Sequence, residues 1–95
     1  MSNISVAIIT RNEEGRIRKC LESVKWADEI IIVDDKSQDR TVDICKEYAN
    51  LKVYEKQLEG FGEQKNFAIL RASGDWVLSV DADEVVPEEL KKEIL

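Results

Sequence analysis

The strongest constraint on the fold of this chain is a unit that occurs four times along it. Each unit is a short apolar run rich in isoleucine and valine, followed by a polar turn and a segment of helical periodicity. Strands that alternate with helices are typical of α/β proteins, in which helices cover a mostly parallel sheet. The pattern predicts an open α/β sheet of about four strands with flanking helices. The expected strands are residues 4–9, 29–33, 51–54 and 76–80.

Four helices are expected after these strands. Asn12 is in position to cap the first helix, and Asp39 or Ser37 the second. Gly74 lies in a turn that ends the third helix, and Pro87 marks the first position of the fourth. The residues expected to face inward are Ile17, Cys20, Leu21, Val24, Val42, Cys45, Tyr48, Ala49, Leu90 and Ile94, and the third helix is expected to pass through Lys65, Phe67, Ala68 and Leu70.

The charge balance and the residue types exclude several classes of protein. Fourteen Lys and Arg against twenty Asp and Glu give a net charge of −6. Nucleic acid is therefore not an expected partner, because phosphate binding needs a basic surface. No apolar run approaches the roughly 20 residues that span a bilayer. Two cysteines without a CxxC pair, and an N-terminus unlike a signal peptide, predict a cytoplasmic protein with reduced, buried thiols.

The domain organisation is simple. Ninety-five residues are enough for one small core, and no linker or repeat separates a second domain. The helical pattern after Pro87 stops before a further strand covers the fourth one. We therefore expect residues 1–95 to form a single subdomain, truncated after its last acidic motif. The uncovered fourth strand also makes a homodimer a possible assembly.

Acidic side chains follow two of the apolar runs at the point where each strand should end. Asp34 and Asp35 follow the second run, and Asp81, Asp83 and Glu84 follow the fourth. In open parallel sheets, ligands bind outside these carboxyl ends. Like charges about 4 Å apart repel by about 4 kcal/mol at an effective dielectric near 20, so the cluster favours a bound cation. Oxygen ligands without histidine or cysteine suit Mg²⁺ or Mn²⁺ rather than zinc.

Four ordered motifs resemble the N-terminal half of family 2 glycosyltransferases. They are IITRNE at 8–13, VDDKSQDRT at 33–41, GFGEQKN at 60–66 and DADE at 81–84. The resemblance covers essentially the whole chain. It is greatest to bacterial members that add sugars to lipopolysaccharide core or other surface glycans. It implies a Rossmann-like GT-A fold, here truncated.

The resemblance also implies a reaction. Members of this family transfer a sugar from a nucleotide sugar, usually a UDP-sugar, to a hydroxyl of a glycan or lipid-linked acceptor. The transfer proceeds with inversion, and Mg²⁺ or Mn²⁺ acts as the Lewis acid. The family's general base lies beyond the DADE motif, so the catalytic base is unknown for this chain. We expect the isolated chain to bind nucleotide weakly and to transfer nothing, and the full-length protein to lie close to a membrane.

Site residues carry over from the resemblance motif by motif. Asp35, with Asp34 supporting it, would accept hydrogen bonds from uracil or ribose. Asp83 would hold the metal ion together with Asp81, which also faces the ribose or the sugar. Lys65 would approach the base or the diphosphate. The other residues expected beside the nucleoside are Thr10, Asn12 and Glu13.

Plainer roles stay open for several of these residues. Thr10 and Asn12 could instead satisfy free N–H groups at the start of the first helix. Lys65 could be a solvated helix lysine. Asp39 and Asp75 are interpreted as turn residues or caps.

Rival classes also stay open. A receiver-like, Mg²⁺-binding signalling module gathers aspartates at strand ends, but it needs an acidic pair after the first strand. A sugar nucleotidyltransferase needs a glycine-rich basic loop there. This chain has Thr10, Arg11 and Asn12 at that position. A third alternative is a non-catalytic remnant that self-associates through its fourth strand.

Overall fold

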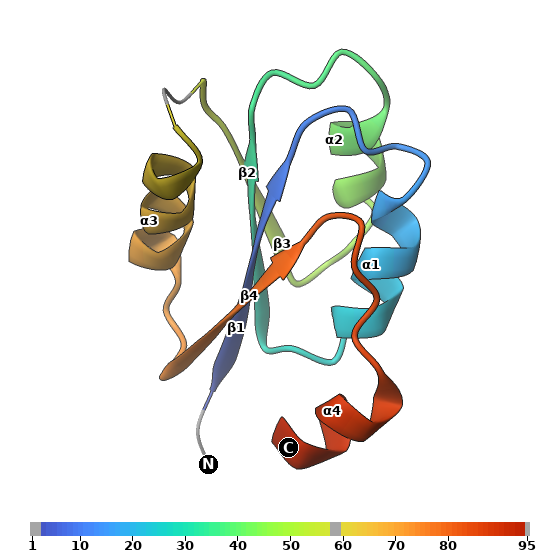
Figure 1. Ribbon diagram of the computed structural model, residues 1–95, viewed down its shortest axis with the longest axis vertical. Coiled ribbons are helices and arrows are strands. Elements are labelled where there is room, and N and C mark those ends of the chain that lie inside the picture. Colours follow the sequence, from blue (N-terminus) through green and yellow to red (C-terminus); the bar gives the residue numbers. More distant parts are fainter. Residues whose placement is uncertain (1–2, 58–59, 95) are drawn as a thin grey trace.

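A computed structural model describes residues 3–57 and 60–94 and confirms the parallel α/β sheet (Figure 1). The strand order is β3-β2-β1-β4, and each neighbouring pair is parallel. Every strand extends one residue further at its carboxyl end than the sequence predicts. The strands are β1 (Ile4–Thr10), β2 (Glu29–Asp34), β3 (Leu51–Glu55) and β4 (Trp76–Asp81).

Helices lie on both faces of the sheet. Two helices pack on one face and a third on the other, and the last lies near the amino ends of the strands (Figure 1). Among the described residues, no helix is long and apolar enough to cross a membrane. The helices are α1 (Ile17–Val24), α2 (Thr41–Cys45), α3 (Phe61–Arg71) and α4 (Glu88–Ile94).

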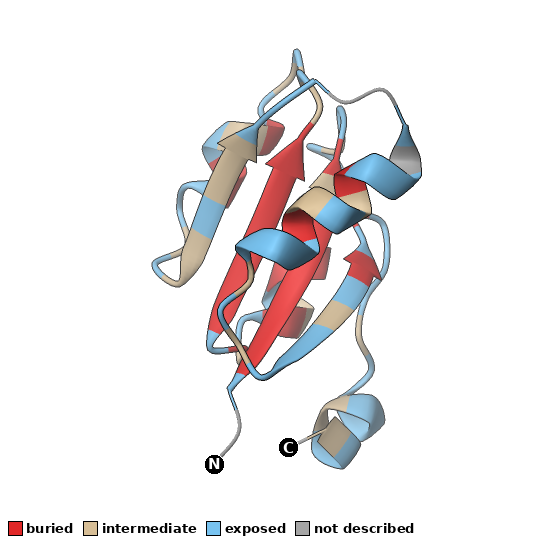
Figure 2. Cartoon of the chain, turned by 90° about the vertical axis from the view of Figure 1, so that its left-hand side faces the viewer, coloured by how far each residue is buried: buried red, intermediate tan, exposed pale blue. Residues whose placement is uncertain are grey.

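The core follows from the position of β1 and β2 in the middle of the sheet. Both strands are covered on both faces and are buried almost throughout, which explains why their sequences are apolar without alternation (Figure 2). The larger cluster packs under α1 and α2, and a smaller one packs under α3. Cys20 and Cys45 lie in the larger cluster as free thiols, as predicted, and burial raises the pKa of each to about 12.

Some helix predictions were wrong. The helix α1 begins only at Ile17, and Asn12 does not cap it. The short helix α2 ends before Tyr48, and α4 has no buried residue.

The edge strand β4 is poorly covered. Trp76 and Val77 at its start are exposed, and they line a groove of about 330 Å³ together with Ile4, Leu78 and Ile94. The uncovered fourth strand expected from the sequence is therefore present in the fold.

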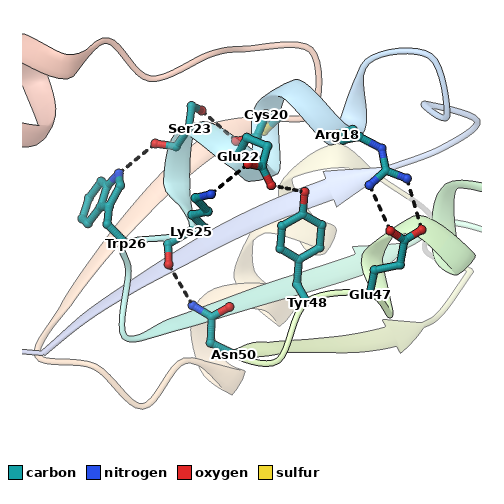
Figure 3. A network of polar contacts seen from close by, with 9 residues as sticks. All are labelled: Arg18, Cys20, Glu22, Ser23, Lys25, Trp26, Glu47, Tyr48 and Asn50. Atoms are coloured by element: carbon teal, nitrogen blue, oxygen red, sulfur yellow. Dashed lines mark hydrogen bonds and ion pairs between the residues drawn. The ribbon is translucent and has the colours of Figure 1, made fainter.

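A polar network joins α1 to the segment that follows α2 (Figure 3). Arg18 donates two hydrogen bonds to Glu47, at 2.9 and 3.1 Å, and the Tyr48 hydroxyl donates to Glu22 at 2.6 Å. The Asn50 side-chain amide donates to the carbonyl of Ala27 at 2.8 Å. Exposed ion pairs such as Arg18–Glu47 contribute little to stability, so this network orients α1 more than it stabilises the fold.

A buried carboxylate ties the amino ends of the strands together. Glu29 opens β2, and its Oε2 accepts hydrogen bonds from the Ser5 hydroxyl at 2.9 Å and from the Ser73 N–H at 3.0 Å. The Ser73 hydroxyl donates to the same oxygen. Lys52 Nζ lies 4.0 Å from Oε1. One side chain thus links β1, β2 and the turn before β4.

This environment predicts a pH dependence of stability. Burial opposes ionisation of Glu29, but the hydrogen bonds from Ser73 and Ser5 and the charge of Lys52 outweigh it, and the pKa lies below its usual value. A lowered pKa in the folded state stabilises the fold above the unfolded pKa of about 4.3, and this contribution is lost as the pH falls through the folded pKa. Urea unfolding between pH 3 and 7 should show stability falling more steeply toward acid in the wild type than in Glu29→Gln.

The control for this measurement is Glu93→Gln, which removes one exposed carboxylate from α4. It should keep the wild-type profile, because Glu93 lies outside the network that holds Glu29. Parallel profiles for the wild type and Glu29→Gln would contradict the assignment.

Candidate functional site

The residues singled out from the sequence come from neighbouring strand ends. Thr10 of β1 pairs in register with Asp34 of β2, and Ile9 of β1 pairs with Asp81 of β4. From β1 the chain continues to β2 and β3 on one side of β1, and it then returns to add β4 on the other side. The strand order therefore reverses at β1. Ligand crevices in open α/β sheets form at such a reversal.

Asp34 is a buried carboxylate whose hydrogen bonds are all made within the protein. It is 1% exposed. Its Oδ1 accepts hydrogen bonds from the Thr10 hydroxyl at 2.6 Å and the Ser37 hydroxyl at 2.5 Å, and its Oδ2 accepts the Ser37 N–H at 2.8 Å. Asp34 and Thr10 therefore form the floor of the site and are not open to a ligand in this arrangement.

Asp35 differs from Asp34 in its exposure and in the partners of its carboxylate. Its N–H donates to the Thr10 carbonyl at 2.9 Å, which fixes its backbone, while its side chain stays partly exposed. Oδ2 lies 3.7 Å from Nη1 of the exposed Arg11. An exposed pair at this distance is weak, so the Asp35 carboxylate can exchange its partner for a ligand donor.

The loops after β1 and β2 are bonded to each other by side chains. Asn12 has a φ of 52°, its N–H donates to the Ser37 hydroxyl at 2.9 Å, and its Oδ1 accepts the Gln38 N–H at 2.7 Å. Neither Asn12 nor Thr10 satisfies the start of α1, so that interpretation is wrong. Lys36 also has a positive φ, of 51°.

The turn before α1 is held by residues from the start of α2. The Glu13 N–H donates to the Thr41 hydroxyl at 2.8 Å, and the Glu14 N–H donates to Asp39 Oδ2 at 3.1 Å. Asp39 also accepts the Thr41 N–H at 2.9 Å, as a turn residue does. It is not the cap of α2 that the sequence predicted, because the N-cap residue is Arg40 and there is no side-chain cap hydrogen bond. The Glu13 carboxylate pairs with Arg16.

Sequence reasoning gave no site role to Ser37 and Thr41. A hydroxyl residue two or three positions after an aspartate, as in the DDKSQDRT run, is the signal that could have suggested them.

The DADE motif forms a tight turn at the end of β4. The Glu84 N–H donates to the Asp81 carbonyl at 2.9 Å, and Glu84 Oε1 accepts the Asp81 N–H at 2.7 Å. Ala82 is buried in the core, so Asp81 and Asp83 on either side of it are exposed. Cys20 lies beneath the turn, and the nearby charges of Glu84, Asp83 and Asp81 add to burial in raising its pKa.

The donor set of this turn suits a divalent ion that keeps other ligands. Within the described part of the chain, no three His, Cys, Asp or Glu side chains are placed to hold a metal together. Asp81 and Asp83 supply only two exposed carboxylates. Mg²⁺ and Mn²⁺ accept such partial protein coordination, because water and phosphate oxygens complete their shells.

Lys65 belongs to the opposite layer of the fold. It lies in the second turn of α3 and is half-buried. The helix α3 begins at the carboxyl end of the sheet and runs back across it (Figure 1). Lys65 therefore lies toward the same end of the molecule as the acidic residues, but on the other face from α1 and α2.

Comparison with known proteins adds to this geometry. An uncharacterised glycosyltransferase from Rickettsia typhi is 47% identical over 95 residues, which are 99% of this chain and 32% of that protein. S. aureus TarS 1–349 in complex with UDP-GlcNAc superposes with a TM-score of 0.83 and 35% identity, over 97% of this chain and 30% of that one. The mannosyltransferase PcManGT from Pyrobaculum calidifontis, in complex with GDP-Man and Mn²⁺, gives a TM-score of 0.79 and 26% identity, over 90% and 29%.

The chain thus spans about a third of the length of the curated relatives it matches. Its fold is the Rossmann-like GT-A arrangement of these glycosyltransferases. The model of the family described as "Glycosyl transferase family 2" matches residues 5–95. The chain belongs to glycosyltransferase family 2.

Proposed function

We propose that this chain forms the donor-binding part of an inverting glycosyltransferase that uses a nucleoside diphosphate sugar, most simply a UDP-sugar. One observation carries the proposal: a fixed, partly exposed Asp35 and an exposed DADE turn stand at the ends of strands on either side of β1. Asp35 offers a hydrogen-bond acceptor for a nucleoside, and the DADE turn offers carboxylates for a metal-bound diphosphate. TarS was solved with UDP-GlcNAc and with UDP, which favours uridine as the nucleoside.

Asp35 would accept hydrogen bonds from the base or ribose, and the adjacent buried Asp34 would support it. Asp83 and Asp81 would hold Mg²⁺ or Mn²⁺. The ion, when bound, neutralises the charge that develops on the leaving diphosphate. Lys65 would add a positive charge on the diphosphate or base side. The remaining residues of the donor pocket would be Thr10, Asn12 and Glu13.

Transfer of the sugar also needs an acceptor and a general base. A glycan or lipid-linked acceptor, as in lipopolysaccharide or surface-glycan synthesis in the bacterial cytoplasm, fits the resemblance of the motifs. A general base must reach the acceptor hydroxyl. In the family that the motifs resemble, this base lies beyond the DADE motif. The 95-residue chain should therefore bind the donor without transferring its sugar.

The test is a backbone NMR titration of the chain with UDP, with and without Mg²⁺. Shifts at Thr10, Asp35 and Asp81 should require the metal ion, and Asp83→Asn should weaken binding at least about tenfold by removing a ligand of the ion. Asp75→Asn is the control, since Asp75 is an exposed aspartate at the opposite end of the sheet. It should titrate like the wild type.

A folded wild-type chain without shifts would contradict the proposal. So would binding that is the same with and without Mg²⁺ and in Asp83→Asn.

A further inference from the structure

The hydroxyl of Ser37 stands at the centre of the contacts between the loops after β1 and β2. It accepts the Asn12 N–H from one loop at 2.9 Å and donates to Asp34 Oδ1 at 2.5 Å. The same carboxylate oxygen accepts the Thr10 hydroxyl at 2.6 Å. A continuous chain of hydrogen bonds therefore runs from the first loop through Ser37 to the floor of the site.

Two backbone positions show why these contacts matter. Asn12 and Lys36 both have a positive φ, near 50°, and neither is glycine. Residues with a Cβ adopt this conformation at an energetic cost, which is smaller for asparagine than for lysine. Surrounding contacts must hold such a conformation in place. Here the Ser37 hydroxyl and N–H bond back to Asp34 across Lys36, and Asn12 Oδ1 accepts the Gln38 N–H at 2.7 Å.

The residue placed between these contacts is Asp35. It follows the anchored Asp34 and precedes the strained Lys36, and its own N–H is bonded to the Thr10 carbonyl. Among the described residues its carboxylate has only the exposed Arg11 as an ion-pair partner, at 3.7 Å, and no comparable anchor. The direction of the Asp35 side chain is thus set by the loop on which it lies.

We propose that Ser37 is a positioning residue for the nucleotide donor: its hydroxyl locks the two loops together and holds Asp35 ready for the ligand before binding. This inference rests on the proposed function. A loop ordered in advance saves the conformational entropy that a mobile loop loses when ligand binds, and so raises affinity without touching the ligand. Asn12 acts in the same lock through its side-chain oxygen.

The experiment is isothermal titration calorimetry of the whole chain with UDP and Mg²⁺. Ser37→Ala should lower UDP affinity about tenfold, and Ser37→Thr, which keeps the hydroxyl, should stay within about threefold of the wild type. Asn50→Ala is the matched control. It removes a side-chain amide that bonds backbone carbonyls at the other end of the sheet, so it should lower stability but leave the UDP affinity unchanged.

A second measurement separates positioning from general stability. In the absence of UDP, amide hydrogen exchange at Asp35 and Gln38 should be faster in Ser37→Ala, and unchanged in Asn50→Ala. Asn12→Gly is the second variant and carries the test if Ser37→Ala does not fold. Glycine adopts the backbone conformation of this exposed residue and removes the acceptor for the Gln38 N–H, so the exchange rate at Gln38, measured without UDP, reports on the lock apart from any contact of Asn12 with the ligand.

The outcomes are distinct. If the wild type binds UDP and the folded Ser37→Ala, or Asn12→Gly in its place, binds it equally well, the positioning role is overturned and the proposed function stands. If the folded wild type binds no UDP, both are overturned. Weaker binding restored by threonine supports the lock.

Discussion

Replacing Asp34 by alanine should lower the free energy of unfolding by about 4 kcal/mol, about a quarter or more of the total expected for a domain of this size. The side chain is fully buried and accepts three hydrogen bonds from Thr10 and Ser37. Alanine would leave these donors without an acceptor, and each buried unsatisfied group costs about 1–3 kcal/mol. Urea unfolding followed by circular dichroism measures the difference.

The neighbouring aspartate provides the control. Asp35→Ala removes a carboxylate that is partly exposed and pairs only loosely with Arg11, so stability should change by less than about 1 kcal/mol. The same variant should lose most of its UDP binding if the proposed function holds. Similar losses of stability in the two variants would contradict the division between a structural and a ligand-facing aspartate.

Replacing Gly74 by alanine should cost about 3 kcal/mol, because the backbone of this turn lies directly against β1. A Cβ at this position would lie 2.6 Å from Ser5 Oγ, 2.8 Å from the Ser5 nitrogen and 3.0 Å from the Asn3 carbonyl oxygen. The hydroxyl can rotate away, but the two backbone atoms cannot move without disturbing the start of the central strand β1. Overpacking of this kind typically costs about 1–3 kcal/mol, and rotation of Ser5 would also break its hydrogen bond to Glu29.

Gly62→Ala is the matched substitution at the other end of α3. Within the described residues, and apart from its chain neighbours and the nearby backbone of α3 itself, no atom lies within 4 Å of a Cβ built there, and the residue is helical. Alanine should stabilise the protein by about 0.5–1 kcal/mol, since it reduces the entropy of the unfolded chain. Thermal unfolding of the two variants should give shifts of opposite sign. A shift of the same sign in both would show that the close approach at Gly74 is relieved by movement of the turn.

The central strands and the acidic strand ends were predictable from local sequence. A mostly apolar run such as residues 29–33, without alternation and followed by two aspartates, is typical of a strand in the middle of a parallel sheet. The resemblance of the motifs then supplied the candidate site. Local sequence could not distinguish Asp34 from Asp35, because the burial of one and the exposure of the other depend on the contacts of Ser37 and Thr10.

The failures have a common cause. Asn12 precedes two glutamates and so has the local pattern of a helix cap, yet its partners are Ser37 and Gln38 in another loop. Asp39 has the local pattern of a cap for α2, yet the N-cap residue is Arg40, and Asp39 accepts the Glu14 N–H from the loop after β1. In each case a contact between segments distant in sequence outweighed the local preference.

The order of the strands also affects how the chain reaches its fold. Pairing of β1 with β2 joins residues 24 positions apart, whereas pairing of β1 with β4 joins residues 72 apart. Closing the longer loop costs roughly 1 kcal/mol more in chain entropy. On the ribosome, β4 is also the last of these four strands to emerge. Until it docks, one side of the most apolar strand in the molecule remains an open edge, and this is the stage at which a nascent chain is most exposed to aggregation.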